Sequence, residues 1–483
     1  MGIVVTEAIF LLISFFLALF LIVAIVIVGA FSTHWPGRVF HYLMLLITSV
    51  SVVVVLLSER VLRIEGDALS ISSEADIGGT ILAKFLLVII VGCSVSICIA
   101  WPFVSQKSKI FFSRFESQGS AAPNDVVISF MVYYLAFSIL PLFFGEKFYF
   151  HVSLIYPFFV ILALFLWFRL SNIDPVIISK QCLSLFVFGS LGSAIFMPEF
   201  SMQPGYPSLI PGFDIRLWGV TPHANTLGSA AAALLLLEAA EPSTRRWLRN
   251  SVLVVATLIL VMSQSKTSIL GLLLGLLILI TWRFAISLKR KDSGWIKSRR
   301  LDASAIVAIV TILIAVIGIG VVLLDSSPTE MLRNTFDTRA VEGLKSASGR
   351  TDIWNAAIVG GLENPLFGQG ARYWDQETAD RFGLSGSVNA HNLFMQAFSR
   401  SGFVGLTALL VFLFYLFRCS VRASKQTRGG SIAFTVLFLT RGIFEVTISP
   451  NSILGAEFIA MMAFFLYLID RGGAIKEIRE SKE

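Results

Sequence analysis

Residues 348–354 read SGRTDIW, residues 364–370 read NPLFGQG and residues 390–392 read AHN. All three stretches lie in the one long polar interval of the chain, residues 326–392, which separates two strongly apolar segments. Apolar residues at helical spacing predict a short helix over 350–362, and the Asn-Pro pair ends it because a residue before proline avoids helical geometry. The aromatic residues of the interval argue against a disordered linker. We therefore expect a compact cap on a membrane domain.

The composition outside this interval defines the class of protein. Hydrophobic residues make up 56% of the 483 residues and charged residues only 14%, and the mean hydropathy is +0.81. Soluble domains carry about 25% charged residues. Several apolar runs reach the roughly 20 residues that a bilayer-spanning helix needs. The chain is therefore expected to be an all-α, polytopic integral membrane protein.

The apolar runs predict about thirteen spans, within a range of about 12 to 14. The first run is long for a signal peptide and lacks a basic leader, so we interpret it as a retained helix. The expected spans are 8–30, 39–57, 79–101, 126–145, 151–169, 178–197, 224–240, 251–264, 267–285, 303–324, 393–417, 431–448 and 452–470.

The distribution of Lys and Arg predicts the orientation. The net charge of +7 resembles a nucleic-acid signal, but the basic residues cluster in short loops between spans, which indicates topology instead. Placing the loop with Arg245 and Arg249 in the cytoplasm puts four stretches on the outer face: 58–78, 198–223, the turn at 263–266 and the polar interval. The 198–223 stretch is rich in Pro and Gly, and we expect it to be irregular.

Two histidines stand where an outer loop becomes a span, in His223-Ala224-Asn225 and in His391-Asn392. An imidazole can take a proton near neutral pH and could deprotonate a hydroxyl held within hydrogen-bond reach. The alternative is that both histidines cap helices at the membrane boundary.

Three cations are expected on the same face: Arg216, Lys266 and Arg350. A guanidinium binds phosphate through two hydrogen bonds, and Arg350 would lie near the start of a helix, where free amides also favour anions. The alternatives are a surface arginine paired with Asp352 or Glu363, and a lysine that reaches from the bilayer to water. Together with His391, these cations form a plausible site for a diphosphate and a nucleophilic hydroxyl.

Arg400 and Arg441 fall within expected spans, where an unpaired charge is costly. Glu445 lies one turn after Arg441, and we expect these two residues to form a structural ion pair. Other chemistries find little support. No Gly-rich phosphate loop, zinc-ligand spacing or pair of aspartates typical of metal-dependent sugar transferases is visible. We therefore expect no metal and no cofactor.

The chain resembles the O-antigen ligase and polymerase superfamily, which are membrane glycosyltransferases of the bacterial envelope. The resemblance covers roughly residues 210–410. It is carried, in order, by RLWGVTPHANTLG (216–228), SQSKT (263–267), SGRTDIW (348–354), NPLFGQG (364–370) and AHN (390–392), followed by Gly402 and Gly405.

The resemblance implies a GT-C-like fold with an active site beneath one large periplasmic loop. It implies that His391 is the base and that Arg350 binds the diphosphate, both as catalytic residues. Arg216 and Lys266 fall on the family's other basic positions, although Lys266 replaces the usual arginine and loses its bidentate geometry. With His223, Asn225 and Asn392 these residues form the expected substrate-binding set.

The implied reaction is a metal-free, inverting transfer of a glycan from undecaprenyl diphosphate to a sugar hydroxyl on the periplasmic face of the bacterial inner membrane. Polymerisation of O-antigen or exopolysaccharide repeats is favoured, because the Ser-Lys-Thr turn looks closer to exopolysaccharide polymerases. The alternative is a ligase that uses lipid A-core as acceptor, and a remote alternative is a secondary transporter of a small anion. The implied partners are the lipid-linked donor, the glycan or lipid A-core acceptor, the bilayer, and polysaccharide chain-length and export proteins, with no nucleic acid.

These expectations divide the chain into four parts. They are N-terminal spans (1–200), a transmembrane core with the 198–223 loop and the basic turn 263–267 (201–325), the large periplasmic catalytic loop (326–392), and C-terminal spans with a cytoplasmic tail (393–483).

Overall fold

A computed structural model describes most of the chain. The described residues are 23, 26–58, 60–65, 68–72, 81–107, 122–168, 171, 173–206, 214–291, 348–384, 389–448 and 452–473. The expected span 303–324, most of the expected span 8–30 and the first part of the polar interval (326–347) lie outside the described residues.

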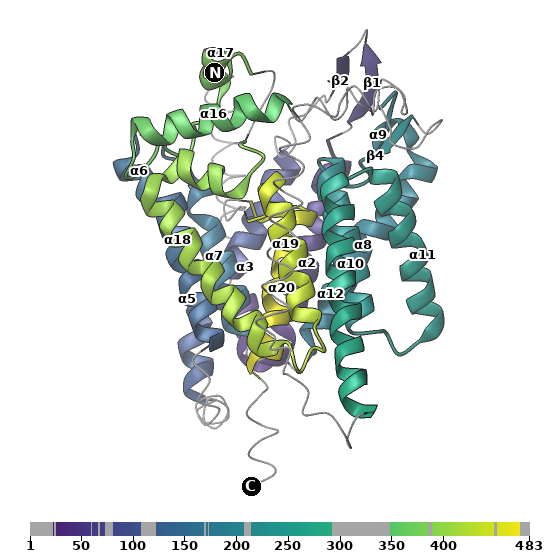
Figure 1. Cartoon of the computed structure of the whole chain (residues 1–483). Helices are drawn as coiled ribbons and strands as arrows, with labels where there is room; N and C mark the ends of the chain where they lie inside the picture. The colour runs from purple at the N-terminus through teal and green to yellow at the C-terminus, as the bar shows by residue number, and fades with distance from the viewer. Residues whose placement is uncertain are drawn as a thin grey trace, which may run out of the picture.

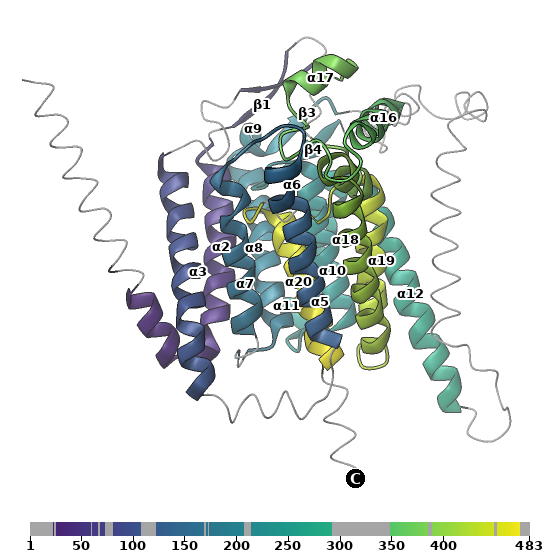
Figure 2. The same cartoon turned by 90° about the vertical axis from the view of Figure 1, so that its left-hand side faces the viewer.

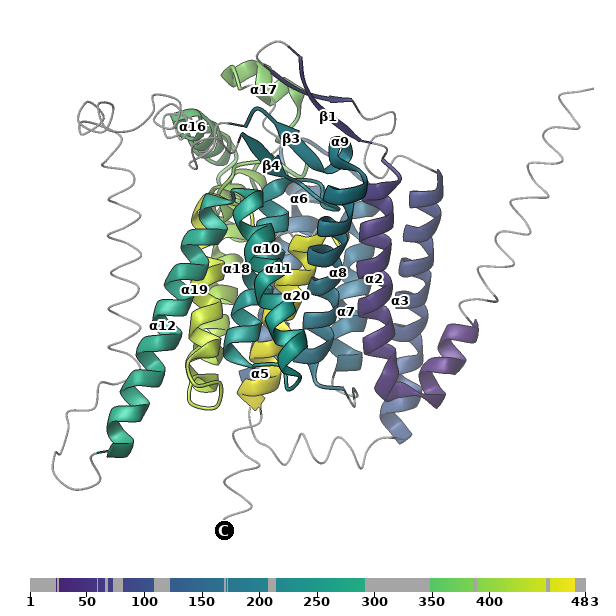
Figure 3. The same ribbon diagram turned by 90° about the vertical axis from the view of Figure 1, so that its right-hand side faces the viewer.

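The described chain is a bundle of long helices, as Figures 1, 2 and 3 show from three sides. Seven of the described helices are long and apolar enough to cross a membrane, and three more are apolar but shorter. The expected all-α polytopic architecture is therefore confirmed. The bundle consists of α2 (Pro36–Leu56), α3 (Ile81–Lys107), α5 (Ala122–Tyr134) continued by the π-helical turn η1 (Leu135–Ile139) and α6 (Leu140–Phe144), the 3-10 turn η2 (Val152–Leu154) leading into α7 (Tyr156–Phe168), α8 (Pro175–Phe196), α10 (Ala224–Ala240), α11 (Arg246–Ser263), α12 (Lys266–Lys291), α18 (Leu393–Ala423), α19 (Gly430–Phe444) and α20 (Ala456–Gly473).

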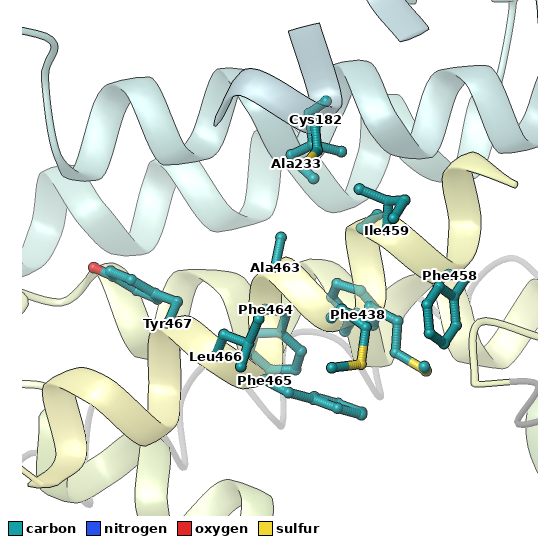
Figure 4. Close-up of a cluster of buried hydrophobic side chains, with 14 of the residues drawn as sticks. Cys182, Ala233, Phe438, Phe458, Ile459, Ala463, Phe464, Phe465, Leu466 and Tyr467 are labelled. Atoms are coloured by element: carbon teal, nitrogen blue, oxygen red, sulfur yellow. The ribbon is translucent and has the colours of Figure 1, made fainter. Parts of the chain in front are cut away.

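Helix α20 lies in the centre of the bundle. Its residues from Phe458 to Leu468 are buried on every side, which is the pattern of a core helix rather than of a surface helix. Figure 4 shows its aromatic side chains beside Phe438 of α19, with Ala233 of α10 and Cys182 of α8 across from it. Four consecutive buried alanines of α10, residues 230–233, allow that helix to pack closely.

Short elements gather at one end of the bundle, which we call the capped end (Figure 1). They are β1 (Val61–Glu65) paired with β2 (Ala68–Ser72), α9 (Pro198–Ser201), β3 (Met202–Pro204) paired with β4 (Ile215–Leu217), α16 (Ser348–Glu363) and α17 (Gln376–Phe382). The helix expected over 350–362 is thus confirmed as α16. The prediction of an irregular 198–223 segment was wrong in part, because its ends pair as a hairpin with Gln203 opposite Arg216.

A buried arginine fixes the 198–223 segment to the bundle. Arg60, which is 1% exposed, donates hydrogen bonds to the backbone oxygens of Phe200, Gly219 and Thr221 at 3.1, 2.9 and 2.8 Å. Its guanidinium also lies over the ring of Trp218, 5.2 Å from the centroid. A buried guanidinium that finds carbonyl partners therefore holds backbone from both ends of this segment in place.

Helix α18 is broken at Gly402, whose φ of +58° is not helical. The loop 364–370 fills the break through its main chain. Gln369 and Gly370 donate to the oxygens of Ser399 and Arg400, both at 3.0 Å, while Phe403 and Val404 donate to the oxygens of Pro365 and Leu366 at 2.7 and 3.1 Å. These bonds replace helical bonds that the break removes. The NPLFGQG stretch therefore attaches the cap to α18 at residues 399–404.

Candidate active site

The carboxylate of Glu445, which we expected to pair with Arg441, lies at the centre of the candidate site. Glu445 follows the last residue of α19 at the capped end. Its Oε1 accepts hydrogen bonds from Asn225 Nδ2 at 2.7 Å and from Arg350 Nη2 at 3.3 Å. Its Oε2 lies 3.3 Å from His391 Nδ1. One carboxylate therefore joins residues from α10, α16 and the start of α18.

Arg216 extends this network from strand β4. Its Nη2 donates to Asn225 Oδ1 at 2.6 Å, and its Nε donates to the backbone oxygen of Ser263 at 3.0 Å. Its guanidinium also lies over the Tyr206 ring, 4.5 Å from the centroid. The amide of Asn225 thus bridges Arg216 and Glu445, and its side chain is engaged at both ends.

His391 is held in an unusual backbone conformation, with a φ of +45°. Strained backbone of this kind persists only where the surroundings impose it. Here the flanking residues do so, because Trp354 Nε1 donates to the Ala390 oxygen at 3.1 Å and the His391 amide donates to Asn389 Oδ1 at 2.8 Å. The imidazole itself remains 32% exposed, so it is accessible to a substrate.

Asn392 caps α18. Its Oδ1 accepts from the amides of Phe394 and Met395, and its Nδ2 donates to the Ile443 oxygen at 2.9 Å. A capping asparagine satisfies amides that the first turn of a helix leaves free. Because the side chain is buried and fully engaged, this geometry favours a role in positioning His391 over the expected contact with substrate.

His223 caps α10 in a similar way, since its Nδ1 accepts from the Asn225 amide at 3.1 Å. That bond requires Nδ1 to be unprotonated, so Nε2 carries the proton of the neutral ring. Burial, together with the positive charge of Arg216, lowers the pKa of His223 to about 4. His223 is therefore a neutral hydrogen-bond donor at physiological pH and adds no charge to the site.

Lys266 is the first residue of α12 and follows a tight turn in which Gln264 has a φ of +50°. The lysine is exposed, and it interacts electrostatically with Arg216 and Arg350. Within the part of the chain that the structure describes, no carboxylate pairs with it. The turn packs tightly on α10, because a Cβ at Gly228 would lie 2.4 Å from Ser265 Cβ.

The charges of the cluster do not balance. Burial by itself raises the pKa of the Glu445 carboxyl, but the hydrogen bond from His391 and the positive charge of Arg350 outweigh it, so this pKa lies below its ordinary value. Glu445 is thus an anion beside the cations Arg216 and Arg350, and a third cation, Lys266, interacts electrostatically with both arginines. The surplus of positive charge favours an anionic ligand.

The structure corrects the expected Arg441–Glu445 pair. Arg441 instead pairs with Glu457 of α20 at 2.5 Å and donates to Ser229 Oγ at 2.5 Å and to the Asn225 backbone oxygen at 3.3 Å. Arg350 pairs with neither Asp352 nor Glu363, and Glu363 pairs with Arg381. The buried Arg400 lies over the ring of Phe137 at 4.7 Å. Because Arg441 pairs with Glu457, the Glu445 carboxylate can pair with Arg350 and His391 instead. The sequence did not predict this position of Glu445 in the site.

The expected residues fall into three groups. Five of them gather around Glu445: Arg216, His223, Asn225, Arg350 and His391. Lys266 lies beside these five residues, and Asn392 caps α18 next to His391. Among the described residues, no three His, Cys, Asp or Glu side chains form a group that could hold a metal ion.

The candidate site is thus a positively charged cluster at one end of an α-helical membrane bundle, and it is built around a histidine–carboxylate pair. Residues 251–410 match the family model described as O-antigen ligase. This part of the chain is therefore similar to the O-antigen ligase family, and the match supports the resemblance to the O-antigen ligase and polymerase superfamily that the sequence motifs indicated. The match runs from α11 into α18 and includes Lys266, Arg350 and His391, while Arg216, Asn225 and Glu445 lie outside it. No curated protein matches the chain.

Proposed function

We propose that the cluster around Glu445 is the active site of a glycan transfer from undecaprenyl diphosphate to a sugar hydroxyl. The observation that carries the proposal is the convergence of Arg216, Lys266 and Arg350 beside the imidazole of His391. Cations next to a titratable base suit a reaction in which a diphosphate leaves while a hydroxyl attacks.

The pairing of His391 with Glu445 determines which ring nitrogen of the imidazole carries the proton. An ionised carboxylate can only accept a hydrogen bond, so Nδ1 of His391 donates to Glu445 Oε2 and the neutral ring keeps Nε2 free to take a proton. Glu445 would then stabilise the imidazolium that forms, as the carboxylate does in other histidine-based sites. His391 is the proposed base and Glu445 its positioning residue.

The proposed step is a single displacement. The acceptor oxygen forms a bond to the anomeric carbon, and the bond from that carbon to the diphosphate oxygen breaks. The proton of the acceptor hydroxyl passes to Nε2 of His391, and the electron pair of the broken bond goes to the diphosphate. Arg350, Lys266 and Arg216 stabilise the charge that grows on this leaving group. The anomeric configuration is inverted, and the proposed step uses no metal ion.

We place this chemistry on the periplasmic face of the inner membrane, because the short loops at the opposite end carry the basic residues. Polymerisation of lipid-linked repeats is the proposed reaction, on the basis of the Ser-Lys-Thr turn at 265–267. Ligation to lipid A-core is the alternative, since both reactions use the same donor. Polysaccharide chain-length and export proteins are the partners that a polymerase would need.

An in vitro assay tests both the chemistry and the acceptor. Purified protein in liposomes is given lipid-linked repeat units alone or with rough lipopolysaccharide. Elongated lipid-linked glycan in the first mixture supports a polymerase, and modified lipopolysaccharide in the second supports a ligase. His391→Ala should lower the rate of either product by about 10²–10⁴-fold. His151→Ala, at an exposed histidine outside the cluster, is the matched control. Wild-type product from the His391 variant would remove the base assignment.

A further inference from the structure

Helix α16 has one face fixed against the bundle. Ala356, Ala357, Gly360 and Gly361 form that face and are buried. A Cβ at Gly360 would lie 2.3 Å from the ring of Tyr373, and a Cβ at Gly361 would lie 2.3 Å from the ring of Phe398. The small residues therefore determine which sides of α16 are left facing outward. In Figure 1 the helix lies across the capped end, transverse to the bundle.

The outward surface of α16 has an apolar side and an acidic side. Ile358 and Leu362 are 40% and 58% exposed, and residues four apart share a helix face. Asp352 and Glu363, about three turns apart, lie on a different side of the helix, and both are exposed. A helix with one side packed, one apolar and one charged has the pattern of an interfacial helix.

The apolar side continues beyond the end of α16. Leu366 is 60% exposed, and its backbone oxygen accepts from the Val404 amide, beside Phe403, which is 50% exposed. Further along α18, Leu410 and Phe414 are 50% and 61% exposed and follow Phe403 at helical spacing. Since α18 is a candidate membrane span, this strip is its lipid-facing side.

A second branch of exposed apolar side chains meets the strip. The ring of Phe367 stacks on Phe144 with centroids 4.8 Å apart, and Phe143 lies against Phe144. Phe143 and Phe144, at the end of α6, are 68% and 55% exposed. Exposed apolar side chains of the spans thus lie next to those of the loop 364–370, which follows the C-terminal half of α16.

We propose that Ile358, Leu362 and Leu366 lie in the boundary between the lipid headgroups and the acyl chains of the bilayer. The occupant of this surface is membrane phospholipid, because the strip is continuous with the lipid-facing side of α18 and because the acidic side of α16 points elsewhere. Arg350, at the other end of the same helix, would then be tied to the level of the membrane surface. This placement depends on the membrane class of the protein and not on the proposed chemistry.

Spin-label accessibility tests the placement. A chain with Cys93, Cys98, Cys182 and Cys419 replaced receives a single cysteine at Ile358 or Leu362, or at the control positions Asp352 and Glu377. Each labelled protein is reconstituted in liposomes of phosphatidylethanolamine and phosphatidylglycerol. We expect the ratio of oxygen to nickel-chelate collisions to be several-fold higher at 358 and 362 than at 352 and 377, because oxygen concentrates in lipid.

Higher accessibility to the nickel chelate than to oxygen at 358 and 362 would overturn the proposal. So would shielding from both reagents, which would show a second protein covering the helix. A chain that keeps its natural cysteines provides a second measurement. Leu362→Trp should add fluorescence that brominated phospholipid quenches, whereas Asp352→Trp should add fluorescence that it does not quench. Equal quenching of the two added signals would contradict the placement.

Discussion

Glu445 is the side chain that connects the other residues of the candidate site. Its carboxylate holds Asn225, Arg350 and His391 together, so its charge should matter most when His391 becomes an imidazolium. We expect Glu445→Gln to lower kcat by about 10- to 100-fold, the effect of losing a hydrogen bond to a charged group. The KM for the donor should not rise, because Arg350 is released to bind it. Steady-state kinetics in liposomes measure both, with Glu377→Gln as control. A raised KM with unchanged kcat would contradict this role.

Arg350 should act on the donor rather than on the acceptor. Removing its guanidinium would take away the proposed charge-assisted contact to the diphosphate, and we expect Arg350→Ala to weaken donor binding by about 10- to 100-fold. Binding of a lipid diphosphate and of the acceptor are measured separately on the same protein. Arg372→Ala changes an exposed arginine of the same loop that stacks on Tyr149, and it should bind both as the wild type does. Equal donor binding by the Arg350 and Arg372 variants would refute the assignment.

His223 should make the fold sensitive to acid. Its pKa is about 4 in the folded chain against 6.5 ordinarily, so the unfolded chain takes up the proton first as the pH falls. Stability should therefore decline between about pH 6.5 and pH 4 and then level off. His223→Asn keeps a capping acceptor for α10 but removes this titration. The melting temperature should fall less between pH 7 and pH 4 in the variant than in the wild type. An equal fall in both proteins would contradict this role of His223.

The sequence indicated which charged side chains the structure would bring together better than it indicated their hydrogen-bond partners. Arg216, Arg350 and His391 could be identified because cations and imidazoles are scarce in apolar surroundings. Glu445 could not, since its spacing from Arg441 predicts a pair within one helix. The helix ends at Phe444, so Glu445 turns away while Arg441 reaches Glu457 on another helix. Spacing along the chain does not reveal such a tertiary choice.

The break in α18 carries a prediction of its own. A Cβ at Gly402 would lie 2.5 Å from the backbone of Leu366, and a φ of +58° is itself unfavourable for alanine. We expect Gly402→Ala to cost more than the roughly 1–3 kcal/mol of backbone strain alone. Gly383→Ala is the comparison, because Gly383 has a φ of +64° in the left-handed region that other residues sometimes adopt, and no atom lies within 4 Å of the added Cβ. Melting temperatures in detergent compare the two. An equal loss would show that the close packing contributes nothing.

The elements differ in how far the sequence predicted them. The spans that the structure describes follow from the length and polarity of the apolar runs, and α16 follows from its spacing. The two short hairpins were missed, because strands of three to five residues among Pro and Gly leave no alternating pattern. The break in α18 was missed as well, because a glycine in an apolar run does not reveal that another segment supplies its hydrogen bonds.

The whole molecule has two ends that differ in charge, and this difference predicts its orientation. Glu377 is exposed on α17 at the capped end, and Lys425 is exposed in the turn after α18 at the opposite end. We expect a membrane-impermeant maleimide to label Glu377→Cys from the periplasm of spheroplasts but to label Lys425→Cys only after the membrane is opened. The unaltered chain, whose described cysteines are half-buried or buried, gives the background. The reverse pattern would invert the proposed topology.

The main-chain contacts between residues 365–370 and the break in α18 impose a particular kind of constraint. Because carbonyl and amide groups make these contacts, the identity of the side chain at Leu366 or Phe367 has little bearing on them. The number of residues does, since adding or removing one would shift every donor past its acceptor and displace the half-helix that begins beside His391. Positions 366 and 367 should therefore tolerate other side chains, whereas the segment should not tolerate a change in length.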